Sequence, residues 1–242
     1  MIAEARWWWR WRGHDPRARP ARVPENAVLR TIAERERAVD AIEQLGLPKY
    51  DDRPKNWDSL AALSAILART GPDARVLDAG AVPNAVILPW LAMYGYRDLV
   101  GINLDVKRAF EVGPIRYERG DLTRTEFADA SFDAITCLSV IEHGVPTDAY
   151  LAEMARLLKP GGILVTSTDY WHEPIATDGK VAWGAPVKVF QPAEIRSMLA
   201  RGDAFGLRPT GELAYVCDEK VVHWKRMRLD YTFIVFTLER AA

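Results

Sequence analysis

Four polar side chains follow short segments that we expect to be strands in the middle of the chain. Asp78 follows "VL", Asn103 follows "LVGI", Asp121 follows "IRYERG", and His143 closes "FDAITCLSVIE". Carboxylate and amide groups form hydrogen bonds with the hydroxyl and amino groups of a polar ligand. An imidazole titrates near neutral pH and suits a general base. These residue types indicate a site that binds a small polar ligand and transfers a proton at one end.

A second group of candidate catalytic residues lies in the segment 169–190, which is too long for a simple connection. Long loops inside compact domains are usually lids or binding loops, or are disordered. Trp171 and Trp183 in this segment suit stacking on a sugar or another flat hydroxylated ligand, and a hydrophobic plug over the sheet explains them equally well. The candidate catalytic residues of the chain are His143 first, followed by Asp169 and His172.

The elements that must position these residues are short apolar runs alternating with segments of helical character. The runs are "RVLDAG", "DLVGIN", "FDAITCLSV" and "GILVTSTD". Apolar runs without polar alternation suit strands that are covered on both faces, as in parallel sheets flanked by helices. The pattern predicts a doubly wound α/β domain over residues 71–242, and "LDYTFIVFTLER" predicts a last strand. Ligands of such sheets bind outside the carboxyl ends of the strands.

Two helices are expected ahead of the sheet, within residues 25–70. Apolar residues recur at a spacing of three and four over residues 25–45, and Gly46 is a plausible stop. The second helix is expected over residues 56–69, with Asn56 as its N-cap.

The first 24 residues form an Arg- and Trp-rich extension. They contain six arginines against Glu4 and Asp15, a balance of +4. Indole and guanidinium groups suit the lipid headgroup zone, so one interpretation is weak contact with a membrane surface. The other interpretation is a poorly ordered terminal segment without a role. The tryptophans concerned are Trp7, Trp8, Trp9 and Trp11.

Composition narrows the class of protein. The net charge of the whole chain is −1, which leaves −5 after residue 24 and no basic surface for nucleic acid. No apolar stretch is long enough to span a bilayer, and the N-terminus does not resemble a signal peptide. Cys137 and Cys217 form no metal-spaced cluster and no disulfide framework. We therefore expect a cytoplasmic protein without a bound metal.

The ordered segments resemble the class I S-adenosylmethionine-dependent methyltransferases over about residues 73–168. The matching motifs are "VLDAG", "LVGINLD", "GDLTRTEFADASFDAITCLSVIEH" and "LKPGGILVTS". Each motif is weak evidence by itself, and four in the right order and spacing are strong. The resemblance implies a Rossmann-like, mostly parallel seven-stranded sheet with an N-terminal helical extension. It also implies S-adenosyl-L-methionine as the cofactor.

The resemblance also implies roles for the matching positions. The first loop would lie against the methionine part of the cofactor, Asn103 against the ribose, and Asp121 against the exocyclic amine of the adenine. Leu138 and Ser139 would border the methionine part through backbone groups. The implied cofactor-binding residues are Asp78, Ala79, Gly80, Asn84, Asn103, Asp121, Leu122, Leu138 and Ser139.

The chain departs from the family pattern at two places. Val82 and Asn84 replace glycines of the first loop, and a β-branched residue such as Val82 is poor at positive φ, so we expect a different loop path. Asn103 replaces the usual acidic ribose ligand, and it can engage both hydroxyls only by using its amide as donor and acceptor. Asp105 is a second candidate for that contact.

The sequence therefore predicts a methyltransferase that acts on a small-molecule or glycan-like acceptor at oxygen. One rival is a catalytically silent binding module that keeps the fold and has a weakened cofactor site. A second rival, a nicotinamide-dependent oxidoreductase, is disfavoured because the three-glycine pyrophosphate fingerprint is missing.

Overall fold

The computed structural model describes residues 16 and 18–241. The helices are α2 (Ile32–Leu45), α3 (Lys55–Arg69), α4 (Ile87–Met93), α5 (Thr147–Leu157) and α6 (Pro192–Ala204). The longer strands are β2 (Arg75–Ala79), β3 (Asp98–Asn103), β5 (Ile115–Arg119), β6 (Phe132–Leu138), β7 (Leu158–Tyr170) and β12 (Leu229–Arg240). The shorter ones are β1 (Ala27–Val28), β4 (Phe110–Val112), β8 (Val181–Ala182), β9 (Ala185–Pro186), β10 (Leu207–Pro209) and β11 (Val222–Trp224).

One mixed sheet runs through the middle of the molecule in the order β1-β12-β7-β6-β2-β3-β5-β4, with β10 and β11 also paired to β12. Strands β7, β6, β2, β3 and β5 are parallel to their neighbours within this group. Antiparallel strands extend both edges, because β12 pairs with β7 and β4 pairs with β5. The carboxyl ends of the parallel strands therefore meet along one edge of the sheet.

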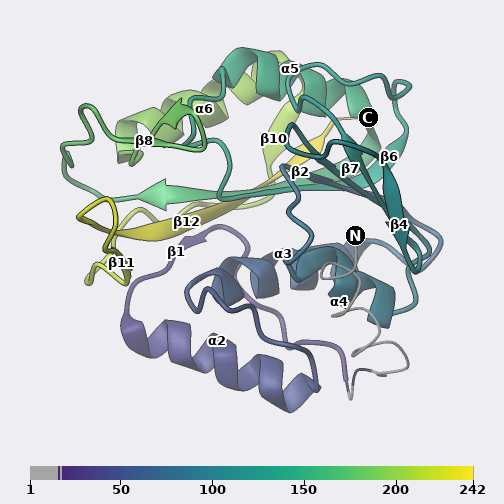
Figure 1. The fold of residues 1–242 in the computed structure, drawn as a ribbon, viewed down its shortest axis with the longest axis horizontal. Coiled ribbons are helices and arrows are strands. Elements are labelled where there is room, and N and C mark those ends of the chain that lie inside the picture. Colours follow the sequence, from purple (N-terminus) through teal and green to yellow (C-terminus); the bar gives the residue numbers. More distant parts are fainter. Residues whose placement is uncertain (1–15, 17, 242) are drawn as a thin grey trace.

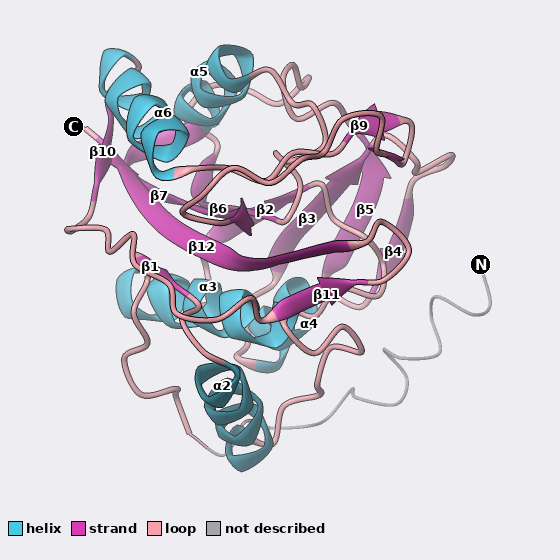
Figure 2. Ribbon diagram, turned by 90° about the vertical axis from the view of Figure 1, so that its left-hand side faces the viewer, coloured by secondary structure: helices cyan, strands magenta, loops and turns pink. Residues whose placement is uncertain are grey.

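Helices cover both faces of this sheet (Figure 1). Helices α5 and α6 lie above it, and α3 and α4 lie below it with α2 packed outside them, an arrangement also seen in the turned view of Figure 2. The central strands are buried almost throughout, for example Val76, Leu77 and Ile135 at 0% exposed. The doubly wound α/β fold predicted from the apolar runs is confirmed.

The seven-stranded sheet that the resemblance implies is present, as β2, β3, β5, β6, β7, β10 and β12. The sheet contains ten strands because β1, β4 and β11, each two or three residues long, add to its edges. Strands this short carry no periodic signal, since two or three residues cannot show alternation.

The predicted helix over residues 25–45 is too long at its N-terminal end. Ala27 and Val28 form β1, which pairs with Val235 and Ile234 of β12 and buries Val28. Thr31 then caps α2, because its hydroxyl accepts a hydrogen bond from the backbone N–H of Glu34 at 3.1 Å. The stop at Gly46 is confirmed, and this glycine has a φ of 74°.

Asn56 is not the N-cap of the second helix, as the sequence predicted. Helix α3 begins at Lys55 with Pro54 in the cap position, and Asn56 is buried inside the first turn. The Asn56 side chain instead holds the preceding loop: its Oδ1 accepts from the N–H of Tyr50 (2.8 Å), and its Nδ2 donates to the Tyr50 carbonyl (2.9 Å). Tertiary contacts, rather than a cap, decide where Asn56 lies.

The Trp7, Trp8, Trp9 and Trp11 run lies outside the described residues. None of the helices in the described part of the chain has the length and apolar character that a membrane crossing requires.

Candidate functional site

A cavity of about 730 Å³ opens at the carboxyl ends of β2, β3 and β6. Its walls come from the loops after these strands, from the first turn of α3, and from the β8–β9 hairpin. Parallel strands bring their carboxyl ends together, which is why residues far apart in the sequence meet here. Most predicted site residues line the cavity: Asp78, Gly80, Asn84, Asn103, Asp121, Leu122, Leu138, Ser139 and His143.

The first loop turns at Gly80, which has a φ of 95°. A Cβ atom at this position would lie 2.5 Å from a methyl group of Val140, so no side chain fits. Gly80 is the one residue with positive φ in the stretch 80–84, all of which is described. Val82 and Asn84 thus avoid the backbone region that disfavours β-branched residues, and the loop needs a single glycine.

Asn103 connects this loop to the end of β3. Its Nδ2 donates to the Gly80 carbonyl (3.1 Å), and its Oδ1 accepts from the backbone N–H of Asp105 (2.9 Å). Both polar atoms of the amide are therefore engaged with backbone. Asp105 lines the cavity next to it and carries an exposed carboxylate.

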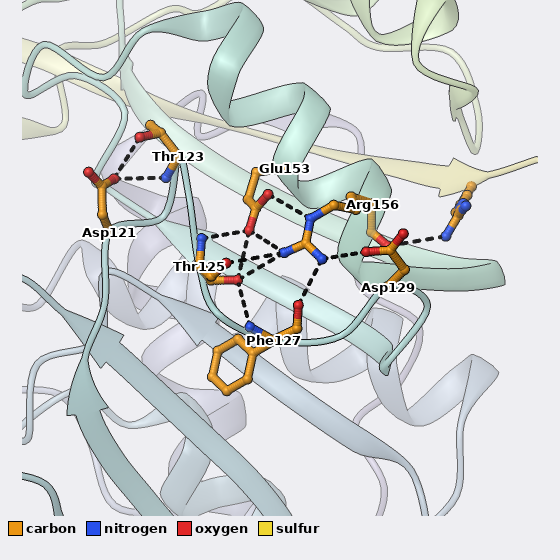
Figure 3. Close-up of polar contacts among 8 residues, drawn as sticks. Asp121, Thr123, Thr125, Phe127, Asp129, Glu153 and Arg156 are labelled. Atoms are coloured by element: carbon orange, nitrogen blue, oxygen red, sulfur yellow. Dashed lines mark hydrogen bonds and ion pairs between the residues drawn. The ribbon is translucent and has the colours of Figure 1, made fainter.

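Asp121 lies in a loop that hydrogen bonds connect to α5 (Figure 3). Its Oδ1 accepts from the N–H (2.9 Å) and the hydroxyl (2.7 Å) of Thr123, a turn closed by the aspartate side chain. Further along, Glu153 accepts from the N–H and hydroxyl of Thr125, both at 2.7 Å. Arg156 donates to Glu153 and to the Phe127 carbonyl. Residues of α5 outside the cavity thus position the loop that carries Asp121.

Two buried carboxyl groups, Asp58 and Asp78, line the cavity. Asp78 is 4% exposed and accepts from the Thr136 hydroxyl at 2.7 Å. Asp58 of α3 is 0% exposed and accepts from the Ser167 hydroxyl at 2.6 Å. Burial raises the pKa of each to about 6, and each hydrogen bond from a hydroxyl partly offsets this rise. The charge of Asp58 also raises the pKa of Asp78, so the two carboxyl groups interact electrostatically.

His143 also lines the cavity, and it lies against an aromatic group. Its ring centroid is 4.8 Å from that of Trp183, and Trp183 in turn stacks on Trp224 at 5.7 Å. Burial, with a smaller effect of Lys55, lowers the pKa of His143 to about 4. The imidazole is therefore neutral at physiological pH and can accept a proton or a hydrogen bond.

Trp183 is 70% exposed and has a φ of 50°, in the two-residue turn that joins β8 to β9. A bulky residue at positive φ is unusual, and such positions cluster at functional sites. Arg226 lies over its ring, with the guanidinium carbon 5.8 Å from the centroid. The segment 169–190 thus places one exposed indole, Trp183, in the cavity wall, whereas Trp171 is buried elsewhere.

Three predicted site residues do not line the cavity. Ala79 is buried inside β2. Asp169 is buried, and burial together with Glu142 raises its pKa well above the ordinary value. His172 turns away, with its Nδ1 3.0 Å from the sulfur of Cys217.

Several lining residues were not predicted at all. Tyr50, Lys55, Asp58 and Ser59 come from the N-terminal segment, and Ala185 comes from the hairpin. One feature of the sequence could have indicated these residues. Lys55 and Asp58 are charged residues three apart at the start of a helix that is mostly buried.

Glu142 offers a test of the electrostatics beneath the cavity. It is 1% exposed, accepts from the Thr168 hydroxyl, and burial raises its pKa to about 7. A raised carboxyl pKa contributes stability below about pH 4.5 that is lost as the pH rises through about 7. We expect Glu142→Gln to raise the free energy of unfolding by about 1–3 kcal/mol at pH 8 and to change it little at pH 5.

Denaturant unfolding at the two pH values measures this difference. The exposed Glu126→Gln is the matched control and should be neutral at both. A Glu142→Gln variant that is destabilised equally at pH 5 and pH 8 would contradict the expectation, since it would show loss of packing instead of relief of a buried charge.

Comparison with known proteins shows which protein family this sequence matches. Residues 77–166 match the family described as "Methyltransferase domain". A demethylmenaquinone methyltransferase from Mycobacterium marinum is 35% identical over 142 residues, which cover 55% of this chain and 54% of that protein. The chain spans from about a fifth to about half the length of the curated relatives it matches.

Solved structures share the fold. The 1,6-didemethyltoxoflavin-N1-methyltransferase of Burkholderia thailandensis covers 95% of this chain and 100% of its own, at a TM-score of 0.55 and 18% identity. The [4+2]-cyclase SpnF covers 77% and 84%, at a TM-score of 0.55 and 15% identity. At such identities the likeness shows the fold alone. Residues 77–166 thus match a methyltransferase domain, in agreement with the resemblance that the four motifs predicted.

Proposed function

We propose that this protein transfers a methyl group from S-adenosylmethionine to an oxygen atom of a small-molecule acceptor. The observation that carries the proposal is one cavity in which Asp78, the side-chain-free Gly80 and Asp121 meet a neutral imidazole, His143. The relatives and neighbours with printed acceptors, such as the demethylmenaquinone and didemethyltoxoflavin methyltransferases, support a small acceptor.

The residues of the cavity fit this cofactor. Gly80 turns the first loop along the cavity wall without a side chain, and a buried oxygen of Asp58 has no hydrogen-bond partner within the described structure. Asp121 would accept from the adenine amine, and Leu122 would pack on the ring. Asp105 would take the ribose hydroxyls, because the Asn103 amide is already engaged with Gly80 and Asp105 backbone. When bound, the cofactor supplies an electrophilic methyl group on a sulfonium.

His143 acts on the acceptor side. Its neutral imidazole takes the proton from the acceptor hydroxyl, which makes the oxygen a better nucleophile. Trp183 beside it provides a flat wall that orients the acceptor and excludes water. Asp169 and His172 remain the alternative candidates from the sequence, and their contacts with Glu142 and Cys217 favour structural roles.

Isothermal titration calorimetry tests the cofactor part of the proposal. We expect the protein to bind S-adenosylmethionine and S-adenosylhomocysteine with dissociation constants well below about 1 mM, as several charge-assisted hydrogen bonds in a closed cavity require. Absence of heat with both ligands would reject the proposal.

A catalytically silent binding module is the second candidate. The engaged amide of Asn103 favours it, because the ribose is left with one exposed carboxylate, Asp105. Release of S-adenosylhomocysteine in the presence of a panel of hydroxylated small molecules separates the two candidates. Binding without release for any member of a broad panel would favour the silent module.

A further inference from the structure

The cavity wall next to Asp78 carries an acid–base pair from outside the matched segment 77–166. Lys55 and Asp58 lie in the first turn of α3, three residues apart, so their side chains leave the same side of the helix. Both line the cavity together with Asp78. The pair therefore belongs to this chain's N-terminal segment and not to the shared strand-end motifs.

Asp58 lacks one of the hydrogen bonds that a buried carboxyl group requires. Its Oδ2 accepts from the Ser167 hydroxyl, which also accepts from the backbone N–H of Ser139 at 3.1 Å. Its Oδ1 has no partner in the described structure although Asp58 is 0% exposed. An unpaired buried carboxyl oxygen is costly, and a structural role toward Ser167 explains only the other oxygen. A donor from a ligand would complete the site.

The neighbouring Asp78 indicates that this donor is a cation. One oxygen of Asp78 accepts from Thr136, and the charge of Asp58 adds to the rise in the pKa of Asp78. Two buried carboxyl groups that line one cavity are best relieved by a positively charged group with several N–H donors. An ammonium group has this charge and three donors.

Lys55 adds a positive charge to the cavity wall that carries Asp58 and Asp78. It is the one lysine or arginine among the described residues that line the cavity, and in the described structure its ammonium group has no hydrogen-bond or ion-pair partner. Burial alone lowers the pKa of Lys55, but Tyr50, Glu142 and Asp58 raise it above its ordinary value, so the group stays charged. The positive end of the α3 dipole adds to its attraction for an anion.

We propose that Asp58 accepts the α-ammonium group and Lys55 binds the α-carboxylate of the amino-acid part of S-adenosylmethionine, so that α3 selects ligands with an intact zwitterion. The inference rests on the proposed function and assigns a part of the same site. It predicts that the N-terminal segment, and not the strand ends alone, decides which adenosine compounds bind.

Calorimetry with three ligands tests the assignment. S-adenosylhomocysteine carries both charged groups, its decarboxylated analogue S-adenosyl-3-thiopropylamine keeps only the ammonium, and 5′-methylthioadenosine has neither. Asp58→Asn should weaken the two amine-containing ligands at least about tenfold and leave 5′-methylthioadenosine within about twofold. Lys55→Met should weaken S-adenosylhomocysteine alone by about tenfold.

The exposed Asp51→Asn and Lys49→Met are the matched controls and should bind all three ligands like the wild type. Equal losses for 5′-methylthioadenosine and S-adenosylhomocysteine would overturn the inference, because they would show general damage to the cavity. Unchanged affinities in both variants would overturn it as well, while leaving the proposed function standing. A wild-type protein that binds none of the three ligands would reject the proposed function and this assignment together.

Discussion

Asp78→Ala is expected to weaken the binding of S-adenosylhomocysteine at least about a hundredfold, close to complete loss in a calorimeter. Asp78 lies near the end of β2, between β3 and β6, and lines the cavity. Alanine removes the carboxylate and leaves the Thr136 hydroxyl without its acceptor. Both effects act on the part of the cavity that also contains Asp58.

The pH gives an independent check of the same residue. Because burial raises the pKa of Asp78 to about 6, the carboxyl group of the free protein is ionised above this value and protonated below it. Affinity for the ammonium-bearing ligand should fall as the pH drops through about 6. Asp73→Ala, exposed at the opposite end of β2, is the matched control. If Asp78→Ala binds S-adenosylhomocysteine normally and remains folded, the site has been placed wrongly.

His143→Ala is expected to lower kcat by about a hundredfold or more, the usual effect of losing a general base. The affinity for S-adenosylhomocysteine should stay within about twofold, because His143 lies against Trp183, on the acceptor side. Release of S-adenosylhomocysteine with the best acceptor of a panel measures kcat. Calorimetry measures the affinity for S-adenosylhomocysteine. His143→Gln keeps most of the volume beside Trp183 and separates loss of the base from loss of packing.

The pH profile of kcat, measured at saturating cofactor so that the ionisation of Asp78 does not limit binding, gives the direction of the pH effect. Since burial lowers the pKa of His143 to about 4, its neutral form is present above pH 4. Activity should therefore fall on the acid side near pH 4, and not near the ordinary imidazole value of about 6.5. The exposed His223→Ala, which loses only its contact with Asp230, should leave the profile unchanged. Unchanged turnover in His143→Ala would remove the base role from this residue.

The strands of this protein were predictable because each is a short apolar run buried on both faces. Runs such as "VLDA" and "DAITCL" are typical of strands in the middle of a covered sheet, and they form β2 and β6. The two-residue strand β1 was not predictable, because it exists only where β12 offers a backbone to pair with. Because residues 27–28 form β1, helix α2 begins at Ile32 and not near residue 25 as the sequence predicted.

The strand-end side of the site was also predictable, because parallel strands place the residues after their carboxyl ends together. Asp78, Asn103, Asp121 and His143 meet in one cavity for this reason. The partners of each side chain were not predictable. The amide of Asn103 is engaged with backbone at Gly80 and Asp105, a pairing that depends on how close two loops approach.

The sequence by itself determined the fold class, the family and the edge of the sheet at which the site lies, since apolar pattern and motif order are local properties of the chain. Only the tertiary structure decided that α3 and the β8–β9 hairpin close the cavity. Burial then depends on what packs around a group, and it is burial that leaves His143 neutral and Asp58 with an unpaired oxygen. The sequence gives the residue types directly. The removal of water from His143 and Asp58 requires that segments far apart in the chain pack together.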